Sequence, residues 1–385
     1  MKATLLAGVA LSLAAVLAAC SGGSGDQGEP AGGAGSAQPS TQTGEPSSPS
    51  ASATASTPGR PGRPRVVGTV ATGLRAPWGV TFLPDGTALV GERDTTRVVA
   101  IDADAKPEVR TVGRVEGVQP QGEAGLLGLA VSPSYAKDHR VYAYLSTPED
   151  NRVVTMTYDG RRLGPVRPVL TGIPNGFIHD GGRLLFAPDG TLFVSTGETG
   201  NRALAQDRGS LGGKILHITT DGDPAPDNPR RGSPVWTLGH RNVQGLAFDD
   251  AGHLWATEFG DSTWDELNRI DKGRNYGWPL VEGKGGQPGY RDPFVQWRTS
   301  EASPSGLAYL DGSLWAGALR GGRLWQVPVR GDGVGKPRDW FVGDYGRLRT
   351  VVAAPDGNLW VTTSNRDGRG EPRPKDDRIL VVAPR

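Results

Sequence analysis

The stretch FLPDGTALV at residues 82–90 decides the fold, because the chain repeats it. Each copy is an apolar segment, a Pro-Asp-Gly-type turn and a second segment rich in β-branched or aromatic residues, a pattern that predicts a β-hairpin. The further copies are FAPDGTLFV (186–194), APDGNLWV (354–361), the looser FDDAGHLW (248–255) and YLDGSLW (309–315), and LAVSP (129–133) leading to VYAYL (141–145), whose turn is altered.

The spacing of these copies predicts the architecture. Equivalent turn positions lie 45 to 62 residues apart, which is the length of one four-stranded blade. Six copies therefore predict an all-β, six-bladed β-propeller over residues 61–385. We expect the segments 66–70 and 379–382 to share one blade and close the ring, which removes exposed sheet edges. The 58 glycines and 31 prolines among 385 residues agree with short strands and many turns.

The first 60 residues carry a different signal. A basic start and an apolar run over residues 4–19, too short for a comfortable membrane span, lead to LAAC at residues 17–20. This resembles a bacterial lipoprotein cleavage box, so residues 1–19 are predicted to be a lipoprotein signal peptide and Cys20 the lipidated N-terminus. An ordinary secretory signal is the alternative. Residues 20–60, rich in Ser, Gly and Pro, are predicted to be a disordered tether. The propeller is then expected in the bacterial cell envelope, outside the cytoplasmic membrane and held to it only by the N-terminal lipid.

Charge and motif content exclude several classes of protein. A formal net charge of +1 disfavours nucleic acid as a partner, and a single cysteine excludes a disulfide framework or a four-cysteine metal site. The sequence has no phosphate-binding Walker loop, no zinc cluster, no dinucleotide fingerprint and no serine nucleophile elbow. Redox chemistry would therefore require a cofactor held in another way.

Four arginines stand out near the predicted inner strands: Arg241, Arg320, Arg347 and Arg349. Residues that enter the innermost strand of a blade line the channel mouth, so we expect these side chains to converge from equivalent blade positions on one anionic ligand. Guanidinium groups suit carboxylates, which they can bind through two hydrogen bonds. A single arginine is more often a solvated surface residue, and the convergence of four favours a binding role.

Two further segments carry candidate chemistry. His179, in the glycine-rich segment HDGG, is the best candidate for a general base because imidazole titrates near neutral pH, although a purely structural role stays open. The segment EFGDSTWDE at residues 258–266 is rich in the oxygen ligands that calcium prefers. A solvated acidic turn explains its composition equally well.

Four motifs in order resemble one family: EAGLLG (123–128), HDGGRL (179–184), GHRNVQG (239–245) and NYGWP (275–279). They are similar to the soluble dehydrogenases of glucose and aldose sugars that depend on pyrroloquinoline quinone (PQQ), which is the glucose/sorbosone dehydrogenase family. The likeness runs from about residue 74 to residue 380.

The resemblance implies a fold, an activity and a set of site residues. It implies a six-bladed propeller that holds PQQ and Ca²⁺ over its channel mouth and oxidises the anomeric carbon of an aldose sugar to a lactone. His179 would be the general base and the hydride would pass to the quinone C5, while Arg241 would stabilise charge on the quinone oxygen. The family's contacts fall, for PQQ, on Glu123, Arg241, Asn242, Arg320, Arg347 and Arg349 and, for two calcium ions, on Gly260, Asp261, Glu266 and Tyr276.

Three positions depart from the family pattern. Glu123 replaces a glutamine that approaches the cofactor, which puts a negative charge near a trianionic ligand. Arg320 replaces a lysine, which keeps the charge but changes its geometry. Asp261 replaces a proline, a harmless change if only its carbonyl group binds calcium.

Two other functions remain as alternatives. A calcium-dependent propeller lactonase needs several acidic or amide side chains on one metal, and the convergent arginines argue against it. A non-catalytic binding propeller, tethered to the envelope, is the other alternative. Glu123 favours it, and the joint retention of His179 and the arginines argues against it. The sequence identifies neither the sugar nor the oligomeric state. It also does not identify the electron acceptor, since it contains no Cys-x-x-Cys-His haem motif.

Overall fold

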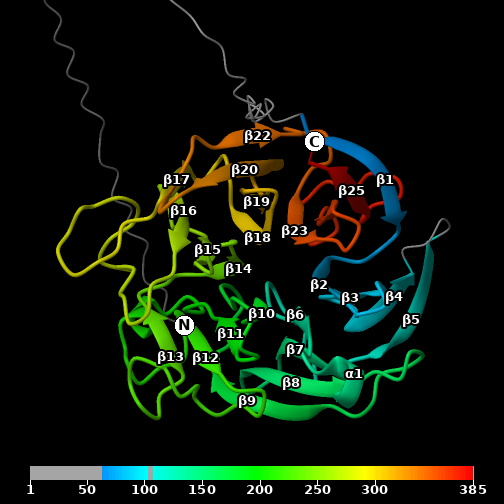
Figure 1. The fold of residues 1–385 in the computed structure, drawn as a ribbon, viewed down its shortest axis with the longest axis horizontal. Coiled ribbons are helices and arrows are strands. Elements are labelled where there is room, and N and C mark those ends of the chain that lie inside the picture. Colours follow the sequence, from blue (N-terminus) through cyan, green and yellow to red (C-terminus); the bar gives the residue numbers. More distant parts are fainter. Residues whose placement is uncertain (1–62, 103–106, 385) are drawn as a thin grey trace, which may run out of the picture. The chain divides into compact units, whose positions relative to one another are not determined.

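The computed structural model describes residues 63–102 and 107–384. The predicted signal peptide, Cys20 and the tether lie outside these residues. Six antiparallel sheets stand around a central axis, with one strand of each nearest to that axis (Figure 1). The prediction of an all-β, six-bladed propeller is confirmed.

The strands follow one another from the centre of each blade outward. Blade 1 is β2 (Pro77–Phe82), β3 (Ala88–Glu92), β4 (Arg97–Asp102) and β5 (Glu108–Arg114). Blade 2 is β6 (Leu126–Val131), β7 (Arg140–Ser146), β8 (Asn151–Thr157) and β9 (Arg167–Ile173). Blade 3 is β10 (Leu184–Phe186), β11 (Leu192–Ser195), β12 (Lys214–Ile218) and β13 (Val235–Leu238). Blade 4 is β14 (Val243–Phe248), β15 (Leu254–Glu258), β16 (Trp264–Arg269) and β17 (Val295–Arg298). Blade 5 is β18 (Pro304–Leu310), β19 (Ser313–Ala318), β20 (Arg323–Arg330) and β22 (Arg338–Trp340), and the short β21 (Gly333–Val334) also pairs with β20. Blade 6 is β23 (Leu348–Ala353), β24 (Leu359–Thr363), β25 (Ile379–Ala383) and β1 (Arg65–Ala71).

Blade 6 closes the ring as predicted. Its outermost strand β1 comes from the start of the propeller and pairs with β25 from its end, in antiparallel register from Arg65 opposite Ala383 to Ala71 opposite Ile379. Helical structure in the described residues is limited to the four-residue α1 (Tyr135–Asp138), which forms the altered turn of blade 2, and the 3-10 turn η1 (Arg202–Ala205). No helix in the part of the chain that the structure describes has the length and apolarity of a membrane span.

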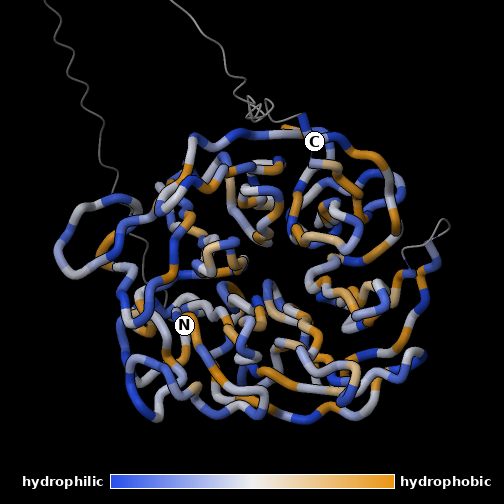
Figure 2. Tube along the Cα trace, in the orientation of Figure 1, coloured by the Kyte–Doolittle hydropathy of each residue, from blue (hydrophilic) through white to orange (hydrophobic). Residues whose placement is uncertain are grey.

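The repeated hairpin also accounts for the packing between blades. Its second strand carries a large side chain that lies against the next blade: Trp255 packs with Leu307 of blade 5, and Trp360 packs with Val80 of blade 1. Both tryptophans are at most 2% exposed. Figure 2 shows hydrophobic segments running along the strands of the blades. Burial of such aromatic surfaces is a main source of the stability of the ring.

Strand alternation gives the propeller two unlike faces. The Pro-Asp-Gly-type turns join the first and second strands of the blades on one face, here called the turn face. Because consecutive strands are antiparallel, the segments that enter the innermost strands and those that leave the second strands meet on the opposite face, here called the loop face. The candidate site lies on the loop face.

Candidate functional site

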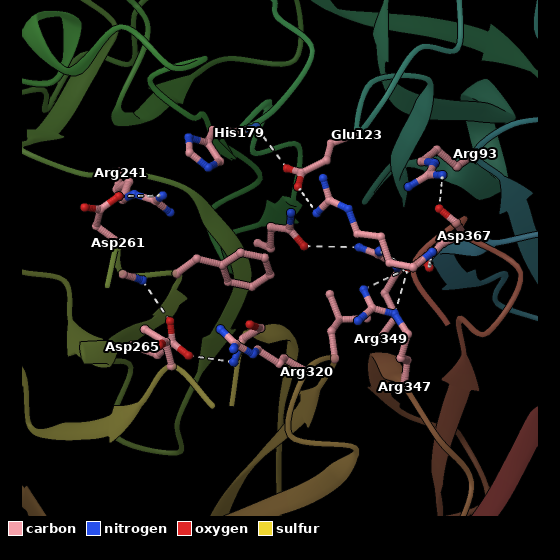
Figure 3. Close-up of a pocket in the computed structure, with 17 residues that line it drawn as sticks. Arg93, Glu123, His179, Arg241, Asp261, Asp265, Arg320, Arg347, Arg349 and Asp367 are labelled. Atoms are coloured by element: carbon pink, nitrogen blue, oxygen red, sulfur yellow. Dashed lines mark hydrogen bonds and ion pairs between the residues drawn. The ribbon is translucent and has the colours of Figure 1, made fainter. Parts of the chain in front are cut away.

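A polar cavity of about 240 Å³ opens on the loop face at the channel mouth (Figure 3). Six arginines and four carboxylate residues are among the side chains that line it. Eight of the residues predicted from the sequence line this cavity: Glu123, His179, Arg241, Gly260, Asp261, Arg320, Arg347 and Arg349. The other three, Asn242, Glu266 and Tyr276, lie in the protein beside it.

The arginines converge as predicted, but not from four equivalent positions. Arg241 precedes β14, and both Arg347 and Arg349 lie where the chain enters β23. Arg320 instead follows β19, the second strand of blade 5. It still reaches the cavity because the connection that leaves a second strand lies on the same face as the segment that enters a first strand. The expectation of equivalent blade positions was wrong for this residue.

His179 is held with one ring nitrogen turned away from bulk solvent. Its Nδ1 lies 2.5 Å from Oε1 of Glu198, a buried carboxylate, and its side chain is 12% exposed. A carboxylate partner requires a proton on Nδ1, which leaves Nε2 as a free acceptor. The backbone of His179 has φ of 60°, and a Cβ atom on Gly197 would come within 1.8 Å of the His179 carbonyl oxygen. Glycine at residue 197 therefore permits the conformation that presents the imidazole.

His240 has a different environment from His179. Its Nδ1 lies 2.8 Å from Oε2 of Glu258, its Nε2 lies 2.9 Å from Oγ1 of Thr237, and the ring stacks on Tyr276. The side chain is fully buried. With both nitrogens engaged, His240 is a packing residue that supports the neighbouring Arg241.

Arg241 and Asn242 carry unused donors beside the cavity. Arg241 Nη2 donates to Oδ1 of Asp261 at 3.2 Å, and its guanidinium lies over the ring of Trp278. Asn242 is fully buried and its Oδ1 accepts from the Gly181 N–H at 3.0 Å. Neither Arg241 Nε nor Asn242 Nδ2 has a hydrogen-bond partner within the described chain. Buried donors without partners are rare in proteins, and these two suit a ligand that carries acceptor oxygens.

On the opposite side of the cavity, Asp367 orients two arginines (Figure 3). Its Oδ2 accepts from Arg347 Nε at 3.1 Å and from Arg349 Nη2 at 3.2 Å. Burial alone would raise the pKa of the Asp367 carboxyl, but the charges of Arg349 and Arg347 lower it to about 2. Arg349 also donates to Ser364 and Gln244. These contacts fix both guanidinium planes before any ligand arrives.

The predicted calcium segment is organised by a carboxylate from another loop. Oε1 of Glu282 accepts hydrogen bonds from four consecutive backbone N–H groups, those of residues 261–264, at 2.8 to 3.2 Å. The Gly260 N–H donates to Oδ1 of Asp265 at 2.8 Å. The N–H groups of residues 260–264 therefore all donate to carboxylate oxygens, and these hydrogen bonds order the segment in which the resemblance places the calcium-binding carbonyls of Gly260 and Asp261. A Cβ on Gly260 would meet the Trp264 carbonyl oxygen at 1.8 Å, so only glycine fits there.

Glu266 and Tyr276 meet beside this segment. With Gly260 and Glu258 they line a space of about 10 Å³, close to the size of one water molecule or ion. Burial, together with the nearby Glu258 charge, raises the pKa of Glu266 well above its usual value. In the residues described, no group of three or more His, Cys, Asp or Glu side chains is placed to hold a metal ion. The resemblance implies that a cation here would be held by the Glu266 carboxylate and a backbone group of Tyr276.

The model of one family, Glucose / Sorbosone dehydrogenase, matches residues 74–373. The chain belongs to the glucose/sorbosone dehydrogenase family.

Solved structures and a sequence relative agree with this membership. The PQQ-bound form of the aldose sugar dehydrogenase from Streptomyces coelicolor is 53% identical, with a TM-score of 0.82 over 84% of this chain and 99% of that chain. A putative oxidoreductase (glucose dehydrogenase) from Thermus thermophilus is 44% identical, with a TM-score of 0.78 over 83% and 100%. Aldose sugar dehydrogenase YliI of Escherichia coli (strain K12) is 30% identical over 80% of this chain and 90% of its own length.

The three departures from the pattern of the glucose/sorbosone dehydrogenase family have defined environments. Glu123 pairs with Arg369, whose Nη1 lies 2.5 Å from Oε1. Asp261 pairs with Arg202 at 3.0 Å and with Arg241 at 3.2 Å. Arg320 lines the cavity next to Leu319. Each added carboxylate therefore has an arginine beside it.

Several site residues were not predicted from the sequence: Arg93, Glu198, Arg202, Glu282, Asp367 and Arg369. Arg93, Glu198 and Asp367 share one signal, because each follows the apolar second strand of a blade within four residues. Arg320, which follows β19 by two residues, obeys the same rule. The predicted residues Gly260 and Asp261, which follow β15, obey it as well. Glu282 lies in a long loop and gives no comparable signal.

Proposed function

We propose that this protein is a PQQ-dependent aldose sugar dehydrogenase that oxidises the anomeric carbon of its substrate to a lactone. The observation that carries this proposal is the His179–Glu198 pair, which presents a free imidazole nitrogen to a cavity rich in arginine. A general base facing an anion-binding site is what the oxidation of a sugar by a polyanionic quinone requires. Its membership of the glucose/sorbosone dehydrogenase family supports the same activity.

The side chains of the cavity fit PQQ. Arg347 and Arg349, oriented by Asp367, would bind its carboxylates, and Arg320 would add a further positive charge. The unpartnered Arg241 Nε and Asn242 Nδ2 would meet its oxygen atoms. When bound, PQQ would be the oxidant that accepts a hydride from the sugar, and Ca²⁺ would contribute Lewis acidity.

The protein's own part in the reaction is proton transfer and charge stabilisation. Nε2 of His179 accepts the proton of the anomeric hydroxyl group as the anomeric C–H bond breaks, and Glu198 stabilises the resulting imidazolium. Arg241 stabilises the negative charge that develops on the oxidant. The backbone carbonyls of Gly260 and Asp261 would hold one calcium ion. The Glu266 carboxylate and a backbone group of Tyr276 would hold a second.

A reconstitution assay tests this function. PQQ and Ca²⁺ are added to the purified protein with a panel of aldoses, and the reduction of an artificial electron acceptor is followed. We expect turnover that requires both additions and stops when a chelator removes calcium. Turnover of lactones or esters with Ca²⁺ alone would favour the propeller lactonase instead. Absence of both activities and of PQQ binding would favour a non-catalytic binding propeller.

The proposed location is the cell envelope, with the propeller held to the membrane through a lipid on Cys20. The support is the LAAC sequence at residues 17–20 and the composition of residues 20–60. Replacement of Cys20 by serine is expected to release the protein from the membrane fraction of cells. Equal membrane retention of the variant would contradict lipidation.

A further inference from the structure

The cavity is expected to bind a ligand of high negative charge, yet it is lined by two carboxylates that the family pattern does not have. Glu123 and Asp261 both line the cavity. An unscreened carboxylate close to a trianion would weaken its binding, because like charges repel strongly where water is partly excluded. The structure shows what offsets each of these charges.

Glu123 is bound at both oxygen atoms. Its Oε2 accepts from the backbone N–H of His179 at 2.9 Å, and its Oε1 accepts from Arg369 Nη1 at 2.5 Å. The Glu123 side chain is 13% exposed, and that of Arg369 is 52% exposed. Burial alone would raise the pKa of Glu123, but the His179 N–H and the Arg369 charge outweigh it and the pKa lies below its usual value. Glu123 is therefore an anion in the folded protein, and Arg369 is its counter-charge.

Arg369 is positioned by the loop that also orients the anion-binding arginines. This loop follows β24 in blade 6, whereas Glu123 precedes β6 in blade 2. Oδ1 of Asp367 accepts from the Arg369 backbone N–H at 3.0 Å, while its Oδ2 holds Arg347 and Arg349. A single short segment thus sets the charge balance on two sides of the cavity.

We propose that Arg369 is an affinity-determining residue for the cofactor, which acts by cancelling the charge of Glu123. Arg369 acts through Glu123 and is a positioning residue rather than a catalytic one. The inference rests on the proposed function, because it takes PQQ as the anion. Without Arg369, the net positive charge of the cavity falls by one unit and Glu123 repels the ligand directly.

A second pair follows the same logic on the other side of the rim. Asp261 pairs with Arg202, whose side chain is 57% exposed, but Asp261 also pairs with Arg241. Because Arg241 remains as a counter-charge, loss of Arg202 is expected to weaken PQQ binding less than loss of Arg369.

The test is a set of PQQ equilibrium titrations on four purified proteins in the presence of Ca²⁺, read by absorbance. These are the wild type, Arg369→Ala, Glu123→Gln and the double variant. At low ionic strength we expect Arg369→Ala to weaken PQQ binding about tenfold, and less at high salt. Glu123→Gln keeps the acceptor for the His179 N–H and removes the charge, so the double variant is expected to bind about as tightly as the wild type. Arg231→Ala, an exposed arginine outside the cavity, is the matched control and is expected to change nothing.

Three results would overturn the proposal. Unchanged PQQ affinity in Arg369→Ala would show that Glu123 needs no counter-charge. Equal weakening in Arg369→Ala and the double variant would show that Arg369 acts without Glu123. A wild type that fails to bind PQQ while Glu123→Gln binds it would also overturn the proposal, because the glutamate would then not be neutralised.

A measurement without cofactor separates this proposal from the proposed function. If none of the four proteins binds PQQ, the proposed function fails. The pairing itself is then judged by urea unfolding of the same four proteins, in which a double-mutant cycle measures the coupling of Glu123 to Arg369. We expect a favourable coupling that decreases in high salt. A coupling of zero at low salt would overturn the pairing.

Discussion

The two faces of this propeller use glycine for different reasons. On the turn face, Gly86, Gly190 and Gly357 have φ of 78° to 88°, and a Cβ on any of them would meet nothing within 4 Å. On the loop face, a Cβ on Gly197 or Gly260 would come within 1.8 Å of a backbone oxygen. Glycine on the turn face satisfies a local backbone conformation, whereas on the loop face it allows two distant segments to touch.

The charged groups of the two faces differ in the same way. Asp189, on the turn face, has its pKa lowered by the hydroxyl and the N–H of Thr191, two residues away. Asp180, on the loop face, is buried, and burial raises its pKa to about 7 despite hydrogen bonds from Asn151 and Gly176. The turn face is thus built from local interactions that repeat with the sequence. The loop face is built from contacts between blades, and it carries the site.

The largest effect is expected on the loop face, at the base. His179→Asn removes proton acceptance at Nε2 while the arginines remain, so turnover is expected to fall about 10²- to 10⁴-fold with PQQ affinity retained. Steady-state kinetics and PQQ titration on the same preparation measure both quantities. Turnover equal to that of the wild type would remove His179 from the proposed mechanism.

A smaller effect is expected from the carboxylate that orders the calcium segment. Glu282→Ala leaves four N–H groups without their acceptor, so the affinity for Ca²⁺ is expected to fall about 10- to 100-fold. Glu282→Gln keeps an acceptor oxygen and is expected to recover part of this loss. Calcium titration, with hydrogen exchange of the amides of residues 261–264, distinguishes the variants. If exchange accelerates in Glu282→Ala and calcium affinity does not change, Glu282 does not position the site.

The buried aspartate beside the base predicts a pH-dependent difference in stability. In the folded state burial raises the pKa of Asp180 to about 7, above its ordinary value of 3.8, so the contribution of this group to the stability decreases as pH rises from about 4 to 7. The Asp180→Asn variant has no carboxyl group at this position and does not show this decrease. The difference in free energy of unfolding, variant minus wild type, is therefore expected to be about 2 kcal/mol larger at pH 8 than at pH 5. Thermal unfolding at both pH values measures it. Asp189→Asn on the turn face is the control, and the same pH trend in both variants would contradict the assignment to burial.

The smallest effect is expected from a change on the turn face. Gly190→Ala places a side chain at a φ of 86° with open space around it, so it is expected to cost about 1 kcal/mol of stability through backbone strain alone. PQQ affinity and turnover are expected to stay at wild-type values. Denaturant unfolding and the standard assay measure the two. A loss of PQQ affinity in Gly190→Ala would contradict the claim that the turn face takes no part in cofactor binding.

The fold was predictable because the turn-face hairpin repeats within the sequence, so its number and spacing give the blades directly. Arg241, Arg347, Arg349 and His179 were also found from the sequence, because polar residues in the segments that enter inner strands point to the channel mouth. Glu198 and Asp367 were missed because the sequence does not mark out a single carboxylate that follows a second strand, although strand alternation brings it to the same face. Glu282 accepts from the Trp264 N–H, which lies 18 positions earlier in the chain, and Arg369 pairs with Glu123, which lies 246 positions earlier. Only the folded ring shows that these residues are neighbours.

The central claim is that the loop face holds the cofactor, and a crystal structure of the protein with PQQ and Ca²⁺ tests it most directly. We predict one PQQ molecule in the cavity between His179 and Arg320, with its carboxylates against Arg347 and Arg349 and with Glu123 still paired to Arg369. PQQ bound at the turn face, or an empty loop-face cavity at saturating PQQ, would contradict this account.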